Sequence, residues 1–225
     1  LALATISPHS YYTYWFFPSR IPLLFEKYMR LRSLSSQEWS EWRQSYLFIL
    51  KQSTYLHGDS KPLLLKSPTN LTRTRVLLEM FPQAKFIEIL RNPLRIWLSL
   101  LNMQKVLLRL HALEDYRWEE IVEAKRQVFV VSMQQWLEEK KLIPPENLVS
   151  VRYEDLVSQP VQTLEHIYEA LGLSPQKARP RWQPYLQSLQ GYQANHLTAS
   201  PADLAFARQH FEFLYDAGRY SLSEH

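Results

Sequence analysis

Two segments of this chain share a pattern in which an apolar stretch ends in a cation, a helix-capping residue and a proline. The first covers residues 63–68 (LLLKSP) and the second covers residues 86–93 (FIEILRNP). Ser67 and Asn92 are residue types favoured as N-caps, and proline is favoured at the first helical position. Each segment therefore predicts a strand that ends where a helix begins, which favours an α/β fold.

This pattern places two cations, Lys66 and Arg91, at the carboxyl ends of predicted strands. Helix N-termini begin there as well, so we expect free backbone N–H groups and the positive end of the helix dipole at the same edge. Ligands of open parallel sheets bind at that edge. Two cations at two such turns predict a ligand with several anionic groups.

Hydrophobic periodicity and turn residues predict the rest of the secondary structure. Strands are predicted at 63–66, 85–90 and 148–151, and the short crossover between the first two favours parallel pairing. Helices are predicted at 37–56, 68–80, 93–113, 117–141, 160–171, 176–188 and 201–217. We therefore predict a three-layer α/β parallel sheet with extra helices.

Composition narrows the possible chemistry. The 225 residues include 46% hydrophobic and 13% aromatic side chains, which is enough for a substantial core. The net charge of +4 fits an anionic ligand, but no dense Lys/Arg block indicates nucleic-acid binding. The absence of cysteine excludes disulfides and thiolate metal sites, and no His/Asp/Glu cluster has metal-ligand spacing. No apolar run reaches the roughly 18 residues of a membrane span.

Several of these segments, taken in order, resemble the sulfotransferase family. They are residues 66–70 (KSPTN), 80–87 (MFPQAKFI), 91–93 (RNP) with Ser99, 151–157 (VRYEDLV) and 171–173 (LGL). The resemblance is to the bacterial and Golgi-type branch and spans about residues 60–175. It implies a P-loop-like fold and transfer of a sulfonate from 3′-phosphoadenosine 5′-phosphosulfate (PAPS) to a hydroxyl or amine, without a metal.

The resemblance also implies which residues bind the donor. It assigns Arg91 and Ser99 to the 3′-phosphate of PAPS and of its product 3′,5′-adenosine bisphosphate (PAP). It places Tyr153 near the adenine, although an ordinary buried tyrosine fits the sequence equally well. Residues 192–196 resemble a loop that closes over the nucleotide, and Asn195 is the candidate there.

Lys66 matches the lysine that stabilises negative charge on the transferring sulfonate and the bridging oxygen. Sulfonate transfer resembles phosphoryl transfer, in which an enzyme supplies position and fixed positive charge. Many relatives place a histidine, as general base, where this chain has Asn70, so the base stays open. Other relatives use a glutamate shortly after their phosphate loop, which would lie upstream of residue 1. Within this chain His57 and Glu88 are the candidates, and Glu88 could equally pair with an arginine.

The family's phosphate loop, a Ser/Thr-rich turn after the first strand, would lie upstream of residue 1. The four glycines are widely separated and form no such loop, and residue 1 is Leu rather than Met. We therefore expect the first strand and the loop to be missing from this chain. We also expect the chain alone to fold incompletely or to bind donor weakly, and not to turn over.

We predict a single sulfotransferase domain over 1–225. It would comprise an aromatic, helical acceptor-side region at 1–58, an α/β core at 60–175 and C-terminal helices at 176–225. Two alternatives remain: a non-catalytic descendant that binds a nucleotide bisphosphate, and a nucleoside-phosphate kinase relative. The kinase would need a glycine-rich loop and an acidic magnesium ligand. The sequence does not identify the acceptor or the compartment, which would be cytoplasmic for a bacterial protein.

Overall fold

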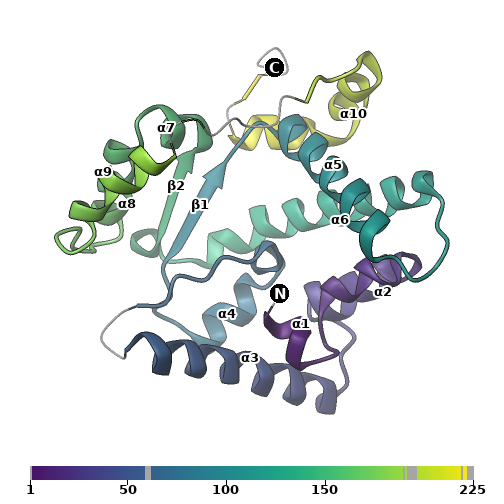
Figure 1. The fold of residues 1–225 in the computed structure, drawn as a ribbon, viewed down its shortest axis with the longest axis horizontal. Coiled ribbons are helices and arrows are strands. Elements are labelled where there is room, and N and C mark those ends of the chain that lie inside the picture. The colour runs from purple at the N-terminus through teal and green to yellow at the C-terminus, as the bar shows by residue number, and fades with distance from the viewer. Residues whose placement is uncertain (1, 59–61, 190, 192–196, 219, 222–225) are drawn as a thin grey trace. The chain divides into compact units, whose positions relative to one another are not determined.

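The computed structural model describes residues 2–58, 62–189, 191, 197–218 and 220–221. It shows a mostly helical α/β protein with a small parallel sheet (Figure 1). The strands are β1 (Phe86–Leu90) and β2 (Leu148–Arg152). The α-helices are α1 (Ala2–Ile6), α2 (Ile21–Leu24), α3 (Ser36–His57), α4 (Thr74–Met80), α5 (Pro93–His111), α6 (Trp118–Glu139), α7 (Tyr153–Ser158), α8 (Pro160–Ala170), α9 (Arg179–Ser188) and α10 (Pro201–Gly218).

Six short helical turns complete the described elements. The 3₁₀ turns are η1 (Tyr11–Trp15), η2 (Pro18–Arg20), η4 (Pro68–Thr72), η5 (Lys140–Leu142) and η6 (Pro145–Asn147), and η3 (Phe25–Met29) is a π-helical turn. The chain forms two compact units. One comprises Leu1–Leu77 and Met103–Lys140, and the other comprises Leu78–Asn102 and Lys141–His225.

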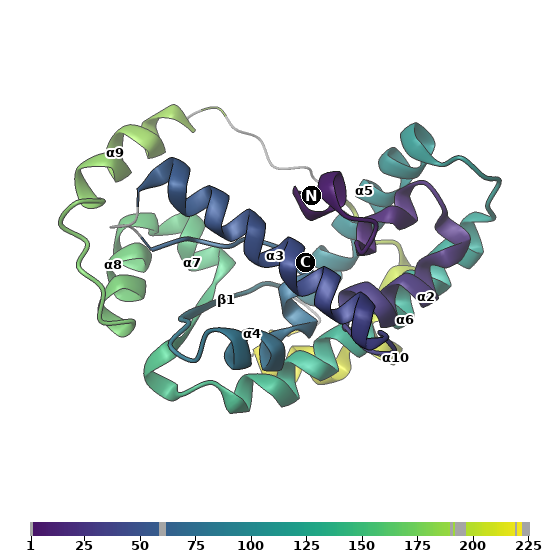
Figure 2. The same cartoon turned by 90° about the horizontal axis from the view of Figure 1, so that it is seen from below.

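The sheet belongs to the second unit. β1 and β2 pair in parallel with the register Phe86↔Leu148 through Leu90↔Arg152, so their carboxyl ends are level. One face of β2 is covered by α8, where Val149 and Val151 form a buried cluster with Ile167 and Leu171. Figure 2 shows α7, α8 and α9 gathered at one end of this unit.

The predicted strand at 63–66 is wrong, because residues 62–67 form no strand in the described structure. Leu64 is 85% exposed and Leu65 is 42% exposed. A strand exists only through hydrogen bonds to a neighbour, and no described residue supplies that pairing here. The parallel partner of β1 is instead β2, which follows it after α5 and α6.

The helix predicted at 68–80 is divided into η4 and α4. Ser67 is not a side-chain cap for η4, which corrects the prediction from its residue type. Its Oγ instead lies 2.8 Å from Oγ1 of Thr69, within the same turn. This local hydroxyl contact competes with capping of the backbone.

The break between η4 and α4 falls at Arg73, a buried cation of the first unit. Its guanidinium donates hydrogen bonds to the carbonyl oxygens of Tyr28 and Met29 and lies 5.2 Å from the ring centroid of Trp42. Burial lowers the pKa of Arg73 to about 10. Through these hydrogen bonds, Arg73 holds the segment that follows Lys66 against the helical turn η3.

The aromatic N-terminus packs mainly into the core of the first unit. Tyr11 and Tyr14 are buried with Phe25, Leu108 and Ile121. Both tyrosines therefore serve core packing, in which each buries a large apolar surface.

Lys125 of α6 lies among these rings. Its Nζ is 3.3 Å from the ring centroid of Tyr14 and donates a hydrogen bond of 3.0 Å to the hydroxyl of Tyr11. The residue is 2% exposed, and burial lowers the pKa of its ammonium group well below the ordinary value. The folded state therefore binds fewer protons at this site than the unfolded chain.

Stability should consequently depend on pH through Lys125. The free energy of unfolding should rise with pH up to the unfolded pKa of about 10.4, by at most about 1.4 kcal/mol per pH unit, and should fall as acid is added. Lys125→Met should remove this slope. Urea melts of both proteins between about pH 7.5 and pH 9.5 measure it, below the titration of unfolded tyrosine. Equal slopes would contradict the assignment.

Candidate functional site

The carboxyl edge of the sheet brings two of the predicted donor-binding residues together. Arg91 directly follows β1, and Tyr153 directly follows the paired residue Arg152 at the end of β2. The Arg91 guanidinium carbon lies 4.0 Å from the centroid of the Tyr153 ring. A guanidinium held on an aromatic face is oriented and keeps its N–H groups free to bind an anion at its edge.

Asn92 caps α5, as predicted from its residue type. Its Oδ1 accepts hydrogen bonds from the backbone N–H groups of Leu94 at 3.0 Å and Arg95 at 3.3 Å. The N–H of Ile96 donates to the Asn92 carbonyl oxygen at 3.1 Å, and Pro93 has no N–H. The expectation of free N–H groups at this turn is therefore wrong, and an anion here would be bound mainly by side chains.

Replacing Asn92 with Ala should lower the free energy of unfolding by about 0.5–2 kcal/mol, because two N–H groups of α5 lose their acceptor. Urea denaturation of the variant measures this loss. The matched control is Asn102→Ala, at an exposed position in the same helix, which should change stability by less. Equal effects of the two substitutions would show that the Asn92 cap contributes nothing specific.

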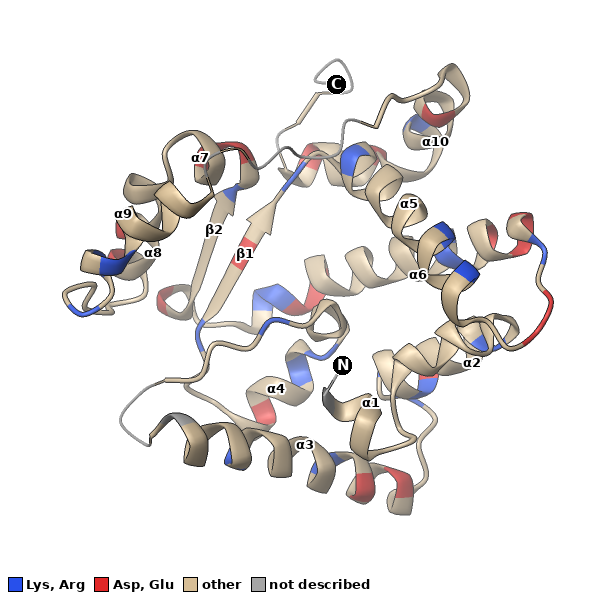
Figure 3. Ribbon diagram, viewed as in Figure 1, with Lys and Arg blue, Asp and Glu red and all other residues tan. Residues whose placement is uncertain are grey.

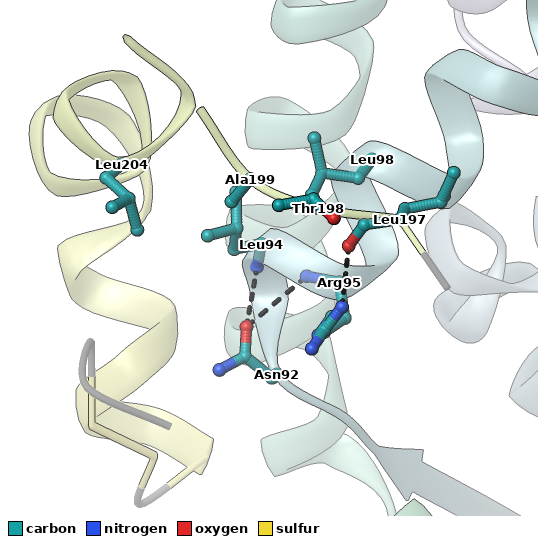
Figure 4. A pocket seen from close by; sticks show the side chains of 8 residues that line it. All are labelled: Asn92, Leu94, Arg95, Leu98, Leu197, Thr198, Ala199 and Leu204. Carbon is teal, nitrogen blue, oxygen red and sulfur yellow. Dashed lines mark hydrogen bonds between the residues drawn. The ribbon is translucent and has the colours of Figure 1, made fainter. Parts of the chain in front are cut away.

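A cavity of about 230 Å³ adjoins this turn (Figure 4). Arg95 spans one side, where its Nη1 donates a hydrogen bond of 2.7 Å to the carbonyl oxygen of Leu197. The lining is mostly apolar and comprises Asn92, Leu94, Arg95, Leu98, Leu197, Thr198, Ala199 and Leu204. The capped turn and this cavity both lie just after the sheet edge.

Ser99 and Asn195 are the other predicted donor-binding residues. Ser99 is exposed on α5, four residues after Arg95, so the two lie on the same face of the helix. This position leaves its hydroxyl open to solvent and to a ligand. Asn195 lies outside the described residues, within the segment 192–196.

Sequence reasoning missed Tyr220, which ties the C-terminal segment to the sheet edge. Its hydroxyl lies 2.6 Å from Oε2 of Glu154 and 3.1 Å from the carbonyl oxygen of Leu90. The Arg152 guanidinium carbon is 4.5 Å from its ring centroid. Burial, together with Glu154, raises the pKa of Tyr220 to about 12, so the hydroxyl keeps its proton at neutral pH.

Tyr220→Phe should lower the free energy of unfolding by roughly 1.5–3 kcal/mol, since a hydrogen bond to a charged group is lost. The buried position of Tyr220, which is 8% exposed, supports an effect of this size. Thermal and urea melts measure it. Tyr185→Phe is the control, because Tyr185 is 64% exposed. A Tyr220→Phe variant as stable as the original protein would show that the hydroxyl does not anchor this segment.

Lys66 belongs to the first unit, where it lies near the end of the irregular segment 62–67 and is exposed. Asn70, four residues later, is half-buried, and its Oδ1 accepts no hydrogen bond from the described residues. Because Oδ1 itself is buried, it is an unsatisfied acceptor inside the protein, and Asn70 therefore supplies neither a base nor an exposed contact here.

The two candidate bases differ in position. Glu88 lies in the middle of β1, is 9% exposed, and accepts a hydrogen bond of 2.5 Å from Ser150, its partner in the register. This contact gives it a structural role inside the sheet. His57 is the last residue of α3, and its side chain is outside the described part of the structure.

The described residues lack two further features. No group of three His, Cys, Asp or Glu side chains there is placed to hold a metal ion. None of the described helices is both long and apolar enough to cross a membrane.

Comparison with known proteins identifies the family. The sequence model that describes the sulfotransferase family matches residues 11–177 of this chain. Over 210 residues, 93% of this chain, the sequence is 32% identical to the omega-hydroxy-beta-dihydromenaquinone-9 sulfotransferases Stf3 of Mycobacterium bovis and Mycobacterium tuberculosis. The match covers 53% of each relative, so the chain spans about half the length of these curated relatives. No solved structure matches. The chain belongs to the sulfotransferase family.

Proposed function

We propose that this protein transfers a sulfonate group from PAPS to a hydroxyl or amine of an acceptor. The observation that supports this most is the Arg91 guanidinium, which ends β1 and lies on the ring of Tyr153 at the end of β2. A guanidinium fork matches two phosphate oxygens, and an aromatic ring offers a face to a purine base. The pair therefore suits a nucleotide with a phosphate on its ribose.

Within this proposal, Arg91 and Ser99 bind the 3′-phosphate, Tyr153 contacts the adenine and Asn195 closes over the nucleotide. Lys66 places positive charge on the transferring sulfonate and on the bridging oxygen. The sulfonate in PAPS is already activated, so in-line displacement needs position and fixed charge rather than a metal. We further propose the three-layer, P-loop-like sheet of the family as the complete fold.

The acceptor proposal comes from the relatives. Both are named for omega-hydroxy-beta-dihydromenaquinone-9. We propose that the acceptor here likewise carries its hydroxyl on a largely apolar molecule. The 32% identity across 93% of the chain supports testing this class first.

The test is an assay of the full-length gene product with ³⁵S-labelled PAPS. The acceptor panel contains ω-hydroxylated isoprenoid quinones, simple phenols, sugars and tyrosine peptides. Transfer of label to the hydroxylated quinones, with release of PAP, is the expected result. Binding of PAP without transfer to any acceptor would support the non-catalytic descendant, and phosphate transfer from ATP would support the kinase alternative.

A further inference from the structure

The second half of α5 carries an apolar stripe that the described structure leaves uncovered. It comprises Met103, Val106, Leu110 and, two residues beyond the helix, Leu113, which are exposed by 46%, 52%, 69% and 72%. The spacing of three and four residues places such positions on one face of a helix. We propose that this α5 stripe docks on a membrane surface that contains anionic lipids.

Aromatic residues lie near the C-terminal end of α5, where the Phe16 ring centroid is 6.0 Å from that of His111 and Tyr116 follows in the next loop. The backbone N–H of Leu113 donates a hydrogen bond of 2.9 Å to the carbonyl oxygen of Phe16, which brings the η1–η2 connection alongside. The Phe16 side chain is 42% exposed, and Tyr116 is 37% exposed. Large apolar residues and tyrosine at one exposed surface are typical of proteins that insert into the lipid headgroup region.

The charges on α5 favour an anionic partner. Arg95, Lys105 and Arg109 are its charged residues at neutral pH, and it contains no Asp or Glu, as the single colour of its charged positions shows (Figure 3). By helical geometry, the exposed Lys105 and Arg109 lie along one edge of the α5 stripe. Cations beside a buried apolar face strengthen binding to anionic lipid.

The acidic groups nearest in sequence lie in the loop after the helix. Glu114 accepts a hydrogen bond of 2.7 Å from the backbone N–H of Ser19, which holds the carboxylate against the protein, and Asp115 is exposed. The Lys105 Nζ lies 5.2 Å from the ring centroid of Trp118, so the exposed Glu119 and Glu120 of α6 also lie near this edge. Glu120 pairs with Arg117 at 3.5 Å. The positive charge that a membrane would meet is therefore that of α5 itself, at Lys105 and Arg109.

These charges favour a lipid surface over a second copy of the chain. Two helices that pair through an apolar stripe are matched by opposite charges on their flanks. Pairing of two α5 stripes would instead bring like charges together, whereas anionic headgroups would neutralise them. The proposal goes beyond sulfonate transfer, because vesicle binding is measured without donor or acceptor.

The experiment is flotation of the protein with vesicles of phosphatidylcholine alone or mixed with phosphatidylglycerol. We expect binding to the mixed vesicles that weakens as salt is added. Val106→Glu should reduce the partition coefficient roughly tenfold, because an apolar contact is lost and a negative charge is added. Replacing Lys105 and Arg109 with Gln should reduce it about fivefold for each charge.

The matched control is Val157→Glu. Val157 is 63% exposed on α7, where its neighbours Glu154 and Asp155 are acidic. Both glutamate variants should keep the circular dichroism spectrum and thermal midpoint of the parent protein, so that reduced binding reports the surface. Equal binding by the Val106→Glu and Val157→Glu proteins would overturn the proposal. A dimer in sedimentation that Val106→Glu dissociates, without vesicle binding by the parent, would also overturn it.

Discussion

Lys66→Ala should lower kcat of the full-length gene product by roughly 10²–10³-fold, the loss observed when one preorganised donor to a developing charge is removed. Lys66 is exposed in the segment before η4, so the change removes no buried contact and should leave stability unaltered. The dissociation constant of PAP should also stay nearly the same, because PAP lacks the sulfonate that this cation is proposed to contact. Steady-state kinetics and PAP calorimetry measure the two quantities separately.

Lys51→Ala is the matched control, since Lys51 is another exposed lysine of the first unit, on α3. Its kcat should equal that of the unmodified protein. A Lys66→Ala enzyme that binds PAP less tightly but keeps its kcat would show that Lys66 only binds the donor. Lys66→Arg should restore part of the rate if positive charge at this position is what matters.

The two cation–cap–proline segments illustrate what sequence reasoning can predict. At residues 86–93 the prediction was correct: a strand ends at Leu90 and Asn92 caps the next helix. At residues 63–68 the same pattern forms neither a strand nor a side-chain cap. Capping is a local property of a few residues, whereas strand formation requires a partner elsewhere in the chain.

Like strand formation, the contacts that complete the candidate site depend on residues that are distant in the sequence. Arg91 and Tyr153 meet because Leu90 is level with Arg152 in the register, and nothing in either segment encodes that pairing. Tyr220 reaches the same edge from the C-terminal end of the chain. Neither contact produces a periodicity or a motif, so only the family resemblance pointed to Tyr153, and nothing pointed to Tyr220.

Arg73, in the first unit, is another residue whose surroundings the local sequence does not predict. It lies within the helix predicted at 68–80, and its guanidinium is buried against two backbone carbonyl groups and the ring of Trp42. Buried arginines are uncommon, and their acceptors lie far away in sequence. The division of the predicted 68–80 helix into η4 and α4 therefore follows from tertiary contacts.

Arg91→Ala should weaken PAP binding by roughly 1.5–3 kcal/mol, about 10- to 150-fold, because charge-assisted hydrogen bonds to the 3′-phosphate are lost. The capped first turn of α5 has no spare N–H group to replace them. Arg91→Lys should recover only part of the affinity, since an ammonium group cannot form the bidentate fork or lie flat on the Tyr153 ring.

The measurement is calorimetry of the full-length gene product with PAP and with adenosine 5′-phosphate. Arg91→Ala should affect PAP far more strongly, because only PAP carries the 3′-phosphate. Arg179→Ala is the control: Arg179 is an exposed arginine on α9 that pairs with Glu165, and its removal should leave both affinities unchanged. Equal losses of affinity for the two nucleotides would place Arg91 at the 5′-phosphate or the base, and unchanged PAP affinity would remove it from the donor site. We expect Arg91→Ala to lose affinity for PAP selectively, and Arg179→Ala to keep its affinity for both nucleotides. This result requires that the guanidinium at the end of β1 recognise the ribose phosphate.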